Sequence, residues 1–362
     1  RPNCRNRTLK SRFTLIRPGA WCVRVHPSVK VCGLLLTIVT GLLGTRNPYA
    51  NFNMTFFWLI FVLGFTYLTA LTGNLYAVIN PWRVIITAVE RVAPGAFRGR
   101  TPYPRSLGYW PALFFYMCFI WIELFGHTSP FSLALILIGY SAINFAGAWL
   151  VGENSWFRYC EFLAVFLRII SKMAPFDFAQ GRLRLRQPFI GLLREQAEST
   201  SHLAFVLFMI ASTAFDGIRD TVPWVGLYWK YFSPALLPYL GNDSVKAYPA
   251  LQQIYLAYQT AGLALSLCFY FALYLLFAGF AKIVTRSAMS LRELALQFAD
   301  SLVPIAFAFD LAHYFTLIPT QGIQILRLLS DPFGWGWNLF GTARAFATPM
   351  ILDAGVVWHT QV

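Results

Sequence analysis

The chain has 362 residues, of which 57% are apolar and only 12% charged, with 29 basic against 15 acidic residues. Two stretches carry no Lys, Arg, Asp or Glu: Ala247–Ala281, with 35 residues, and Leu124–Gly152, with 29. A helix needs about 20 mostly apolar residues to cross the ~30 Å hydrocarbon layer of a bilayer. This composition excludes an ordinary water-soluble domain and predicts an all-α polytopic transmembrane helical bundle.

Stretches with at most one charge predict about eight membrane spans in chain order. They are Val31–Gly44, Met54–Ile79, Gly108–Gly126, Pro130–Val151, Thr200–Gly217, Ile254–Ala281, Ser301–Gln321 and Ala345 onward. The chain opens on Arg1 and stops at Val362 within the last span, so we expect further residues beyond both ends. A basic segment, Arg1–Lys30, thus precedes one transmembrane domain, Val31–Val362.

Positive charge predicts orientation, because cytoplasmic loops retain Lys and Arg. With eight spans, Arg1–Lys30, Asn80–Leu107, Gly152–Ser199 and Lys282–Asp300 share one side and hold 23 of the 29 basic residues. The amino terminus is therefore predicted to be cytoplasmic. This asymmetry accounts for the +14 net charge without a nucleic-acid partner, and the partners we expect are membrane lipids and other membrane subunits.

Within the cytoplasmic segment Gly152–Ser199, the stretch Trp156–Ala174 has the pattern of an amphipathic helix. Its four charged residues are Arg158, Glu161, Arg168 and Lys172. Their spacings of 3, 7 and 4 residues place them on one helical face. The pattern favours an interfacial helix with its cations toward the headgroups. A helix docked against the spans is the alternative.

The segment Ile218–Gln253 is rich in aromatic residues and proline. Its Trp and Tyr side chains include Trp224, Tyr228, Trp229, Tyr231 and Tyr239. Such amphipathic rings prefer the headgroup level, so the segment is predicted to lie on the periplasmic surface. No repeat of fixed period indicates an inverted-repeat transporter.

Ionisable side chains inside the spans are candidate functional residues, because each costs about 2.5–3.5 kcal/mol on insertion scales. A rise of about 1.5 Å per residue places Asp310 near the midplane of the seventh span, with His313 further out on the same helical face. Asp353 and His359 of the last span bracket Asp310 in depth. Because consecutive helices usually pack together, we expect these four residues to form one cluster.

The cluster would open toward the periplasm past Glu123 and Asp216, near the outer ends of their spans. Two histidines and two carboxylates suit a divalent metal such as Zn, Fe or Mn, and they equally suit a proton relay. The third alternative is a set of Asp–His pairs that only fixes helix packing. His202, near the cytoplasmic end of its span, is predicted to be an interfacial residue.

Four segments resemble a family of multi-pass bacterial inner-membrane proteins, some of which are named fenitrothion hydrolase. They are Gly41–Arg83, Tyr103–Leu124, Ser301–Gly322 and Ser330–Ala343. The AHY around His313 and the DPFGWGWNLFGTA stretch are the most specific parts. The resemblance implies a helical fold in a bacterial inner membrane. It assigns no catalytic residue beyond placing His313 in a motif.

The sequence therefore predicts a metal- or proton-handling membrane protein, either transporter-like or a membrane subunit of a larger complex. One alternative is a metal-dependent hydrolase at the periplasmic face, in which the metal would polarise P=O and activate water. A structural membrane subunit is the other. The chain has no CxxC, HExxH, GxxxxGK[ST] or GxSxG motif, so no enzyme class is indicated by a motif.

Overall fold

The computed structural model describes residues 27–179, 182–194, 197–241, 243–345 and 352–361. Most of these residues are helical, as predicted. Five helices are long and apolar enough to cross a membrane, judged by length and composition: Phe52–Thr72, Pro130–Val151, Thr200–Arg219, Ser244–Thr285 and Leu291–Ser330. Each overlaps one of the predicted spans, with bounds that differ by up to ten residues. Two further spans correspond to shorter apolar helices, Lys30–Leu43 and Trp110–Phe125, and the start of the last lies partly outside the described residues.

The first half of the chain contains most of the bundle. Its elements are α1 (Pro27–Leu43), α2 (Phe52–Met54), η1 (Thr55–Gly64), α3 (Phe65–Thr72), α4 (Tyr76–Ile79), α5 (Pro81–Val92), η2 (Arg105–Leu107), α6 (Trp110–Phe125), α7 (Pro130–Val151), α8 (Glu153–Tyr159), α9 (Phe162–Ser171), β1 (Phe176–Ala179) and β2 (Arg182–Leu185). β1 and β2 form a short antiparallel hairpin in which Phe176 is opposite Leu185.

The second half adds the remaining long helices. Its elements are α10 (Ile190–Arg194), α11 (Thr200–Arg219), α12 (Val222–Gly226), η3 (Leu227–Phe232), α13 (Ser233–Leu236), η4 (Leu237–Leu240), α14 (Ser244–Thr285), α15 (Leu291–Phe298), η5 (Ala299–Leu302), α16 (Val303–Tyr314), α17 (Leu317–Thr320), η6 (Gly322–Gln324), α18 (Ile325–Ser330) and α19 (Ala354–Gln361).

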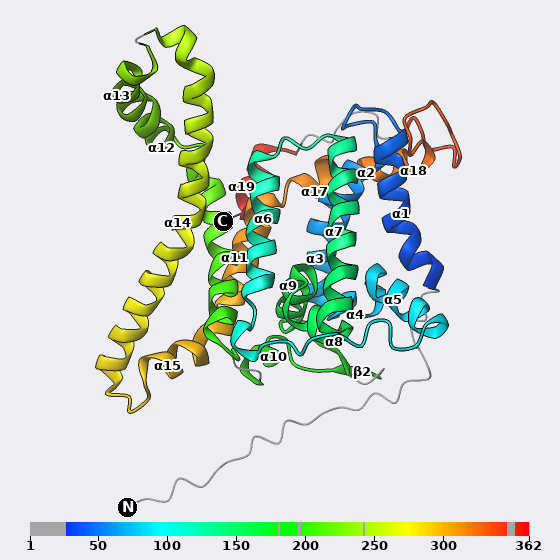
Figure 1. Cartoon of the computed structure of the whole chain (residues 1–362), viewed down its shortest axis with the longest axis horizontal. Helices are drawn as coiled ribbons and strands as arrows, with labels where there is room; N and C mark the ends of the chain where they lie inside the picture. The colour runs from blue at the N-terminus through cyan, green and yellow to red at the C-terminus, as the bar shows by residue number, and fades with distance from the viewer. Residues whose placement is uncertain (1–26, 180–181, 195–196, 242, 346–351, 362) are drawn as a thin grey trace, which may run out of the picture.

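The connections between the long helices gather at two opposite ends of the molecule. Figure 1 shows α5, α8, α10 and α15 at its lower end, and α2, α12, α13 and α18 at its upper end. The lower end thus carries the described parts of the segments that the charge asymmetry assigns to the cytoplasm. The aromatic segment forms α12 to α13 and projects beside the upper part of α14. There Tyr228 is 1% exposed and donates to the backbone carbonyl of Leu251 at 2.6 Å.

The stretch expected to lie on the membrane surface is instead a helical hairpin inserted into the bundle. α8 runs beside α7, where the Trp156 indole donates to Asn144 Oδ1 at 2.8 Å. The chain turns at Cys160, and the Tyr140 hydroxyl of α7 donates to the Glu161 carboxylate. Residues 144 and 140 lie successively nearer the middle of α7, so the hairpin penetrates inward from the lower end.

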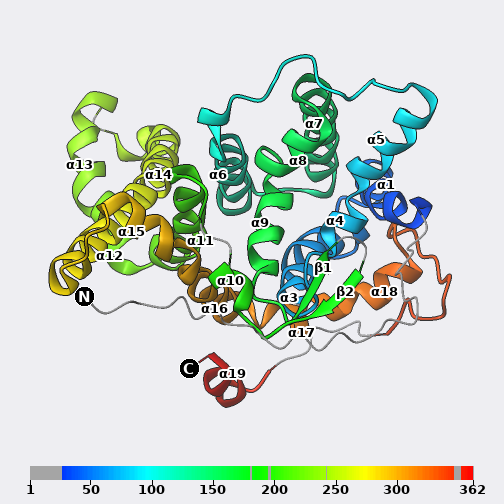
Figure 2. The ribbon, with the colours of Figure 1, turned by 90° about the horizontal axis from the view of Figure 1, so that it is seen from below.

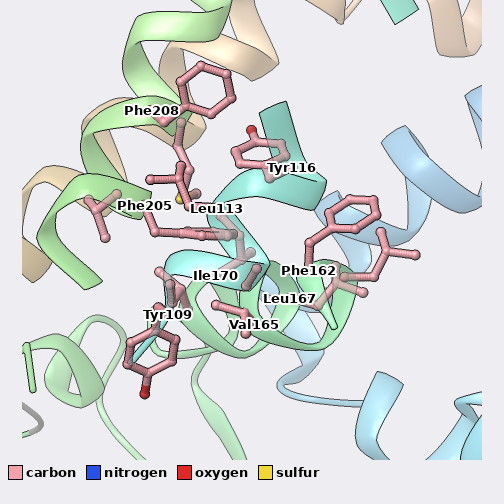
Figure 3. Close-up of a cluster of buried hydrophobic side chains, with 14 of the residues drawn as sticks. Tyr109, Leu113, Tyr116, Phe162, Val165, Leu167, Ile170, Phe205 and Phe208 are labelled. Atoms are coloured by element: carbon pink, nitrogen blue, oxygen red, sulfur yellow. The ribbon is translucent and has the colours of Figure 1, made fainter. Parts of the chain in front are cut away.

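α9 then returns along α6 to the same end. Phe162 stacks on Tyr116, with ring centroids 6.0 Å apart, whereas the Arg168 guanidinium lies over Tyr109 at the start of α6. The apolar side chains of α9 fill the space between α6 and α11 (Figure 3). Viewed from below, α9 lies inside the ring of longer helices (Figure 2). Irregular backbone at this depth is tolerated where protein covers it.

The charges of this stretch explain why the interfacial prediction is wrong. Glu161 is 1% exposed and Lys172 7% exposed, so they do not form a face toward headgroups. Glu161 is the N-cap of α9, because its carboxylate accepts hydrogen bonds from the Leu163 and Ala164 amides at 3.1 and 2.7 Å. The docked helix, the alternative from sequence, is what the structure shows.

Candidate functional site

Asp216, in the last turn of α11, is the centre of a polar cluster near the upper end of the bundle. Its Oδ1 accepts from Arg219 Nε at 2.9 Å. Its Oδ2 lies 2.9 Å from His313 Nε2 and accepts from the Tyr314 hydroxyl at 2.7 Å. Arg219 also donates to the Leu124 carbonyl at 2.8 Å. This Asp216 cluster, defined as Asp216, Arg219, His313 and Tyr314, therefore joins α6, α11 and α16.

Local sequence explains how these side chains converge. Asp216 and Arg219 are three residues apart on α11 and share a face. His313 and Tyr314 are adjacent, and adjacent residues within a helix point in different directions. Both reach Asp216 at the point where α16 ends, at Tyr314. The i,i+3 spacing of Asp216 and Arg219 is a signal of their pairing, whereas the AHY motif marks Tyr314 without indicating that its hydroxyl reaches Asp216.

A cavity of about 110 Å³ lies beside this cluster, enclosed by η1, α6, α9, α11 and α16. Its lining is mostly Phe, Leu and Ile, but Glu123 and Asp310 both face it, and Tyr314 borders it. We call it the acidic cavity. Within the described part of the chain, neither Glu123 nor Asp310 has a basic nitrogen within 4.0 Å. Ser212 and Thr213 add hydroxyl groups to the wall.

The predicted cluster of Asp310, His313, Asp353 and His359 is thus only partly assembled. α19 contacts α16, but Asp353 is exposed and its Oδ1 caps α19 by accepting from the Gly355 amide at 2.8 Å. His359 is exposed as well. The carboxylate beside His313 is Asp216, which the sequence had placed on an access path.

Metal ligation finds no geometric support in the part of the chain that the structure describes. Among those residues, no group of three or more His, Cys, Asp and Glu side chains could hold a metal ion. All four candidate ligands are described residues. We therefore base no proposal on a divalent metal.

A second polar group, not foreseen as a unit, lies near the lower end. Asp300 is 1% exposed. Its Oδ2 lies 2.8 Å from Lys172 Nζ and its Oδ1 3.2 Å from His202 Nε2. His202, near the lower end of α11, is 4% exposed, so its side chain is buried in the bundle, and its predicted interfacial depth stays a prediction. This buried group joins the end of α9 to α11 and η5.

Comparison with known proteins adds no neighbour: no protein-family model matches the chain, and no curated protein or solved structure shows significant similarity to it. The resemblance to the fenitrothion hydrolase family therefore stays a prediction.

Proposed function

We propose that this chain is a multi-pass protein of the bacterial inner membrane, with about eight spans and a cytoplasmic amino terminus. Five helices of spanning length and two shorter apolar ones support a multi-pass arrangement. The lower end of the bundle carries the described basic segments, and the upper end is poor in basic residues (Figure 1). The positive-inside rule then makes the lower end cytoplasmic.

We further propose that the protein moves protons across that membrane through its acidic cavity. The observation that carries this proposal is that Glu123 and Asp310 face one interior cavity without a basic partner among the described residues. Carboxyl groups in a membrane interior are expensive and are typical of proton pathways. A purely structural pair would be expected to have its charge neutralised by a close cation.

The Asp216 cluster supplies a continuation of the route toward the upper end. Tyr314 borders the cavity and donates to Asp216, and Asp216 contacts His313, whose side chain is 33% exposed. The cavity volume of about 110 Å³ is room for several water molecules, which could join the two carboxyl groups. A proton could thus pass between carboxyl groups through water, then along hydrogen bonds to an exposed imidazole.

The inserted hairpin α8–α9 also fits a transport function. Broken or partly inserted helices are typical of transporters, where irregular backbone lines a cavity. Phe162, Leu163, Phe166 and Leu167 of α9 form part of the acidic cavity wall. The hairpin therefore contributes part of the wall that encloses Glu123 and Asp310.

The test is proton flux into liposomes that contain the purified chain, a trapped pH-sensitive dye and a potassium gradient with valinomycin. We expect flux above that of protein-free liposomes. Asp310→Asn and Glu123→Gln should lower it to the protein-free level, because an amide cannot exchange the proton. Asp243→Asn is the matched control, since Asp243 is near the same end, its side chain is 44% exposed and it pairs with Lys246, away from the cavity.

Two results would overturn the proposal. One is flux by the native chain that equals that of protein-free liposomes. The other is native flux retained in both Asp310→Asn and Glu123→Gln. Size-exclusion profiles and thermal melting of each variant separate loss of conduction from loss of folding.

A further inference from the structure

A second opening, at the lower end, is lined mainly by basic residues, whereas the acidic cavity contains two carboxyl groups. It is a cleft of about 760 Å³, bordered by residues of α4, α5, α8 and α9 and by the first residues of α6 and α11. This size is within the range of about 300–1,000 Å³ that is typical of small-molecule sites. Four of its lining residues are cations, and one is an acid. We call it the basic cleft.

Three of the four cations already have carboxylate partners. Arg83 lies 3.0 Å from Glu153, Arg158 lies 2.9 Å from Glu198, and Lys172 lies 2.8 Å from Asp300. The charges of these pairs cancel locally.

Glu198, the acid in the lining, is held ionised at neutral pH. Its partial burial acts to raise its pKa, but the hydrogen bond and charge of Arg158 outweigh burial and lower that pKa. Glu198 is thus ion-paired with Arg158 at 2.9 Å, and the charge of a more distant second cation also lowers its pKa.

Arg168 is that second cation. Its guanidinium donates to the Arg158 carbonyl at 2.8 Å and lies 3.4 Å from the Tyr109 hydroxyl. Both contacts are to neutral oxygens, and within the described residues Arg168 has no carboxylate within 4.0 Å. The cleft therefore carries one positive charge without a compensating carboxylate, on a side chain that the helix α9 holds in place.

An unused hydrogen-bond donor lies in the same lining. Asn80 is 1% exposed, and its Oδ1 caps α5 by accepting from the Arg83 amide at 3.0 Å. That bond fixes the side-chain amide, yet Asn80 Nδ2 is buried without a hydrogen-bond partner among the described atoms. Buried donors normally have partners. A free donor beside an uncompensated guanidinium is complementary to a ligand rich in acceptor oxygens.

We propose that the basic cleft binds a small phosphate-bearing anion, with Arg168 as its principal charge partner. Arginine suits this role because its planar fork can donate two parallel hydrogen bonds to phosphate oxygens. The remaining cations add a positive field at the mouth of the cleft. The phosphate belongs either to a soluble metabolite or to a lipid headgroup. The site is independent of proton movement through the acidic cavity.

The test is calorimetric titration of the purified chain in neutral detergent with inorganic phosphate. We expect saturable binding at millimolar concentration that weakens as sodium chloride is raised. Arg168→Gln should lower the affinity about tenfold or more, the loss expected for one charge-assisted hydrogen bond. Arg292→Gln is the matched control, because Arg292 is an exposed arginine of α15 at the same end but does not line the cleft.

A second variant keeps the proposal testable if Arg168→Gln fails to fold. Asn80→Asp retains the oxygen that caps α5 but places a negative charge in the cleft, so phosphate binding should be abolished. Absence of phosphate binding by the native chain, or equal binding by Asn80→Asp, would overturn the proposal. Stronger binding of succinate than of phosphate would also overturn it.

A competition experiment distinguishes a lipid headgroup from a soluble anion as the source of the phosphate. The same titration is repeated in nanodiscs of phosphatidylcholine alone and of phosphatidylcholine with phosphatidylglycerol. Suppressed phosphate binding in the phosphatidylglycerol discs identifies a lipid headgroup as the ligand, whereas unchanged binding identifies a soluble anion. Either result supports the site, and neither depends on the liposome flux measurement.

Discussion

The buried acidic residues of this protein are of two kinds, those with a cationic partner and those without one among the described residues. Asp300 is paired with Lys172 and His202, and its role is to hold three elements together. Glu123 and Asp310 face a cavity without such partners among the described residues. A paired charge cannot easily change its protonation state without losing its contacts, whereas a carboxyl group beside water can. Asp300 is therefore suited to holding helices together, whereas Glu123 and Asp310 are suited to proton exchange.

Removal of Lys172 should test the packing role. Lys172→Met keeps the apolar part of the side chain but removes the ammonium group and leaves Asp300 with His202 alone. Breaking a buried ion pair typically costs about 3–5 kcal/mol. The control is Lys246→Met. Lys246 lies 3.6 Å from Asp243, but its side chain is 86% exposed, and exposed pairs contribute about 0–1 kcal/mol.

Melting of the two variants in detergent, followed by tryptophan fluorescence, measures the difference. We expect a large drop in melting temperature for Lys172→Met and almost none for Lys246→Met. Equal melting temperatures would show that the buried group around Asp300 does not stabilise the fold.

The sequence identified candidate residues better than their pairing. Glu123, Asp216, Asp310 and His313 were all recognisable as ionisable groups inside apolar stretches, and depth along each helix followed from residue spacing. Depth does not determine how each helix is rotated about its axis or which neighbour it faces. For this reason the sequence predicts that His313 clusters with the last span, whereas in the structure its carboxylate partner is Asp216 on α11.

At the scale of elements, the long helices were predictable and the inserted hairpin was not. Long apolar stretches have few solutions other than a span. By contrast, Trp156–Ala174 has a periodicity that suits one continuous amphipathic helix. The chain instead breaks at Cys160, because Glu161 serves as an N-cap and is satisfied by Tyr140 of a distant helix. A hydrogen bond between residues far apart in the chain does not change the periodicity of the sequence, so it could not be predicted from that pattern.

The hairpin depends on the absence of a side chain at Gly147 of α7. A Cβ atom built there would lie 2.3 Å from the Trp156 ring, whereas a Cβ at Gly139 of the same helix meets nothing within 4 Å. Gly147→Ala should displace α8 and cost about 1–3 kcal/mol, as overpacking does. Gly139→Ala should be neutral or slightly stabilising, since alanine favours a helix.

Maleimide labelling reports on the hairpin itself. Cys160, at its turn, is 2% exposed, so labelling at this residue, located by mass spectrometry, should be slow in the native chain. Gly147→Ala should accelerate it and Gly139→Ala should not. Unchanged labelling in Gly147→Ala would mean that the hairpin does not depend on the close contact between Gly147 and Trp156.

At the scale of the whole molecule, the two openings have opposite chemistry and lie toward opposite ends. The acidic cavity is beside the Asp216 cluster, near the end that carries α12, and the basic cleft is near the end that carries α8 and α10 (Figure 1). α9 contributes residues to both. The helix α9 thus borders both the cavity proposed to conduct protons and the cleft proposed to bind an anion.

The membrane orientation of these ends can be measured directly. Reporter fusions at Arg98, Arg186 and Arg286 should report cytoplasm, because they lie in the segments that hold most of the basic residues. Figure 1 supports a common side for them, since α5, α8, α10 and the end of α14 meet at the lower end of the bundle.

Fusions at Asn47, Lys230 and Phe333 should report periplasm, because α2, α12 and α18 lie at the opposite end (Figure 1). The span count of about eight rests on this alternation, since a missed or extra span would reverse every later site. Two or more reversed sites would contradict the proposed topology. Reversal of all six sites would instead exchange the sides of the membrane on which the acidic cavity and the basic cleft lie.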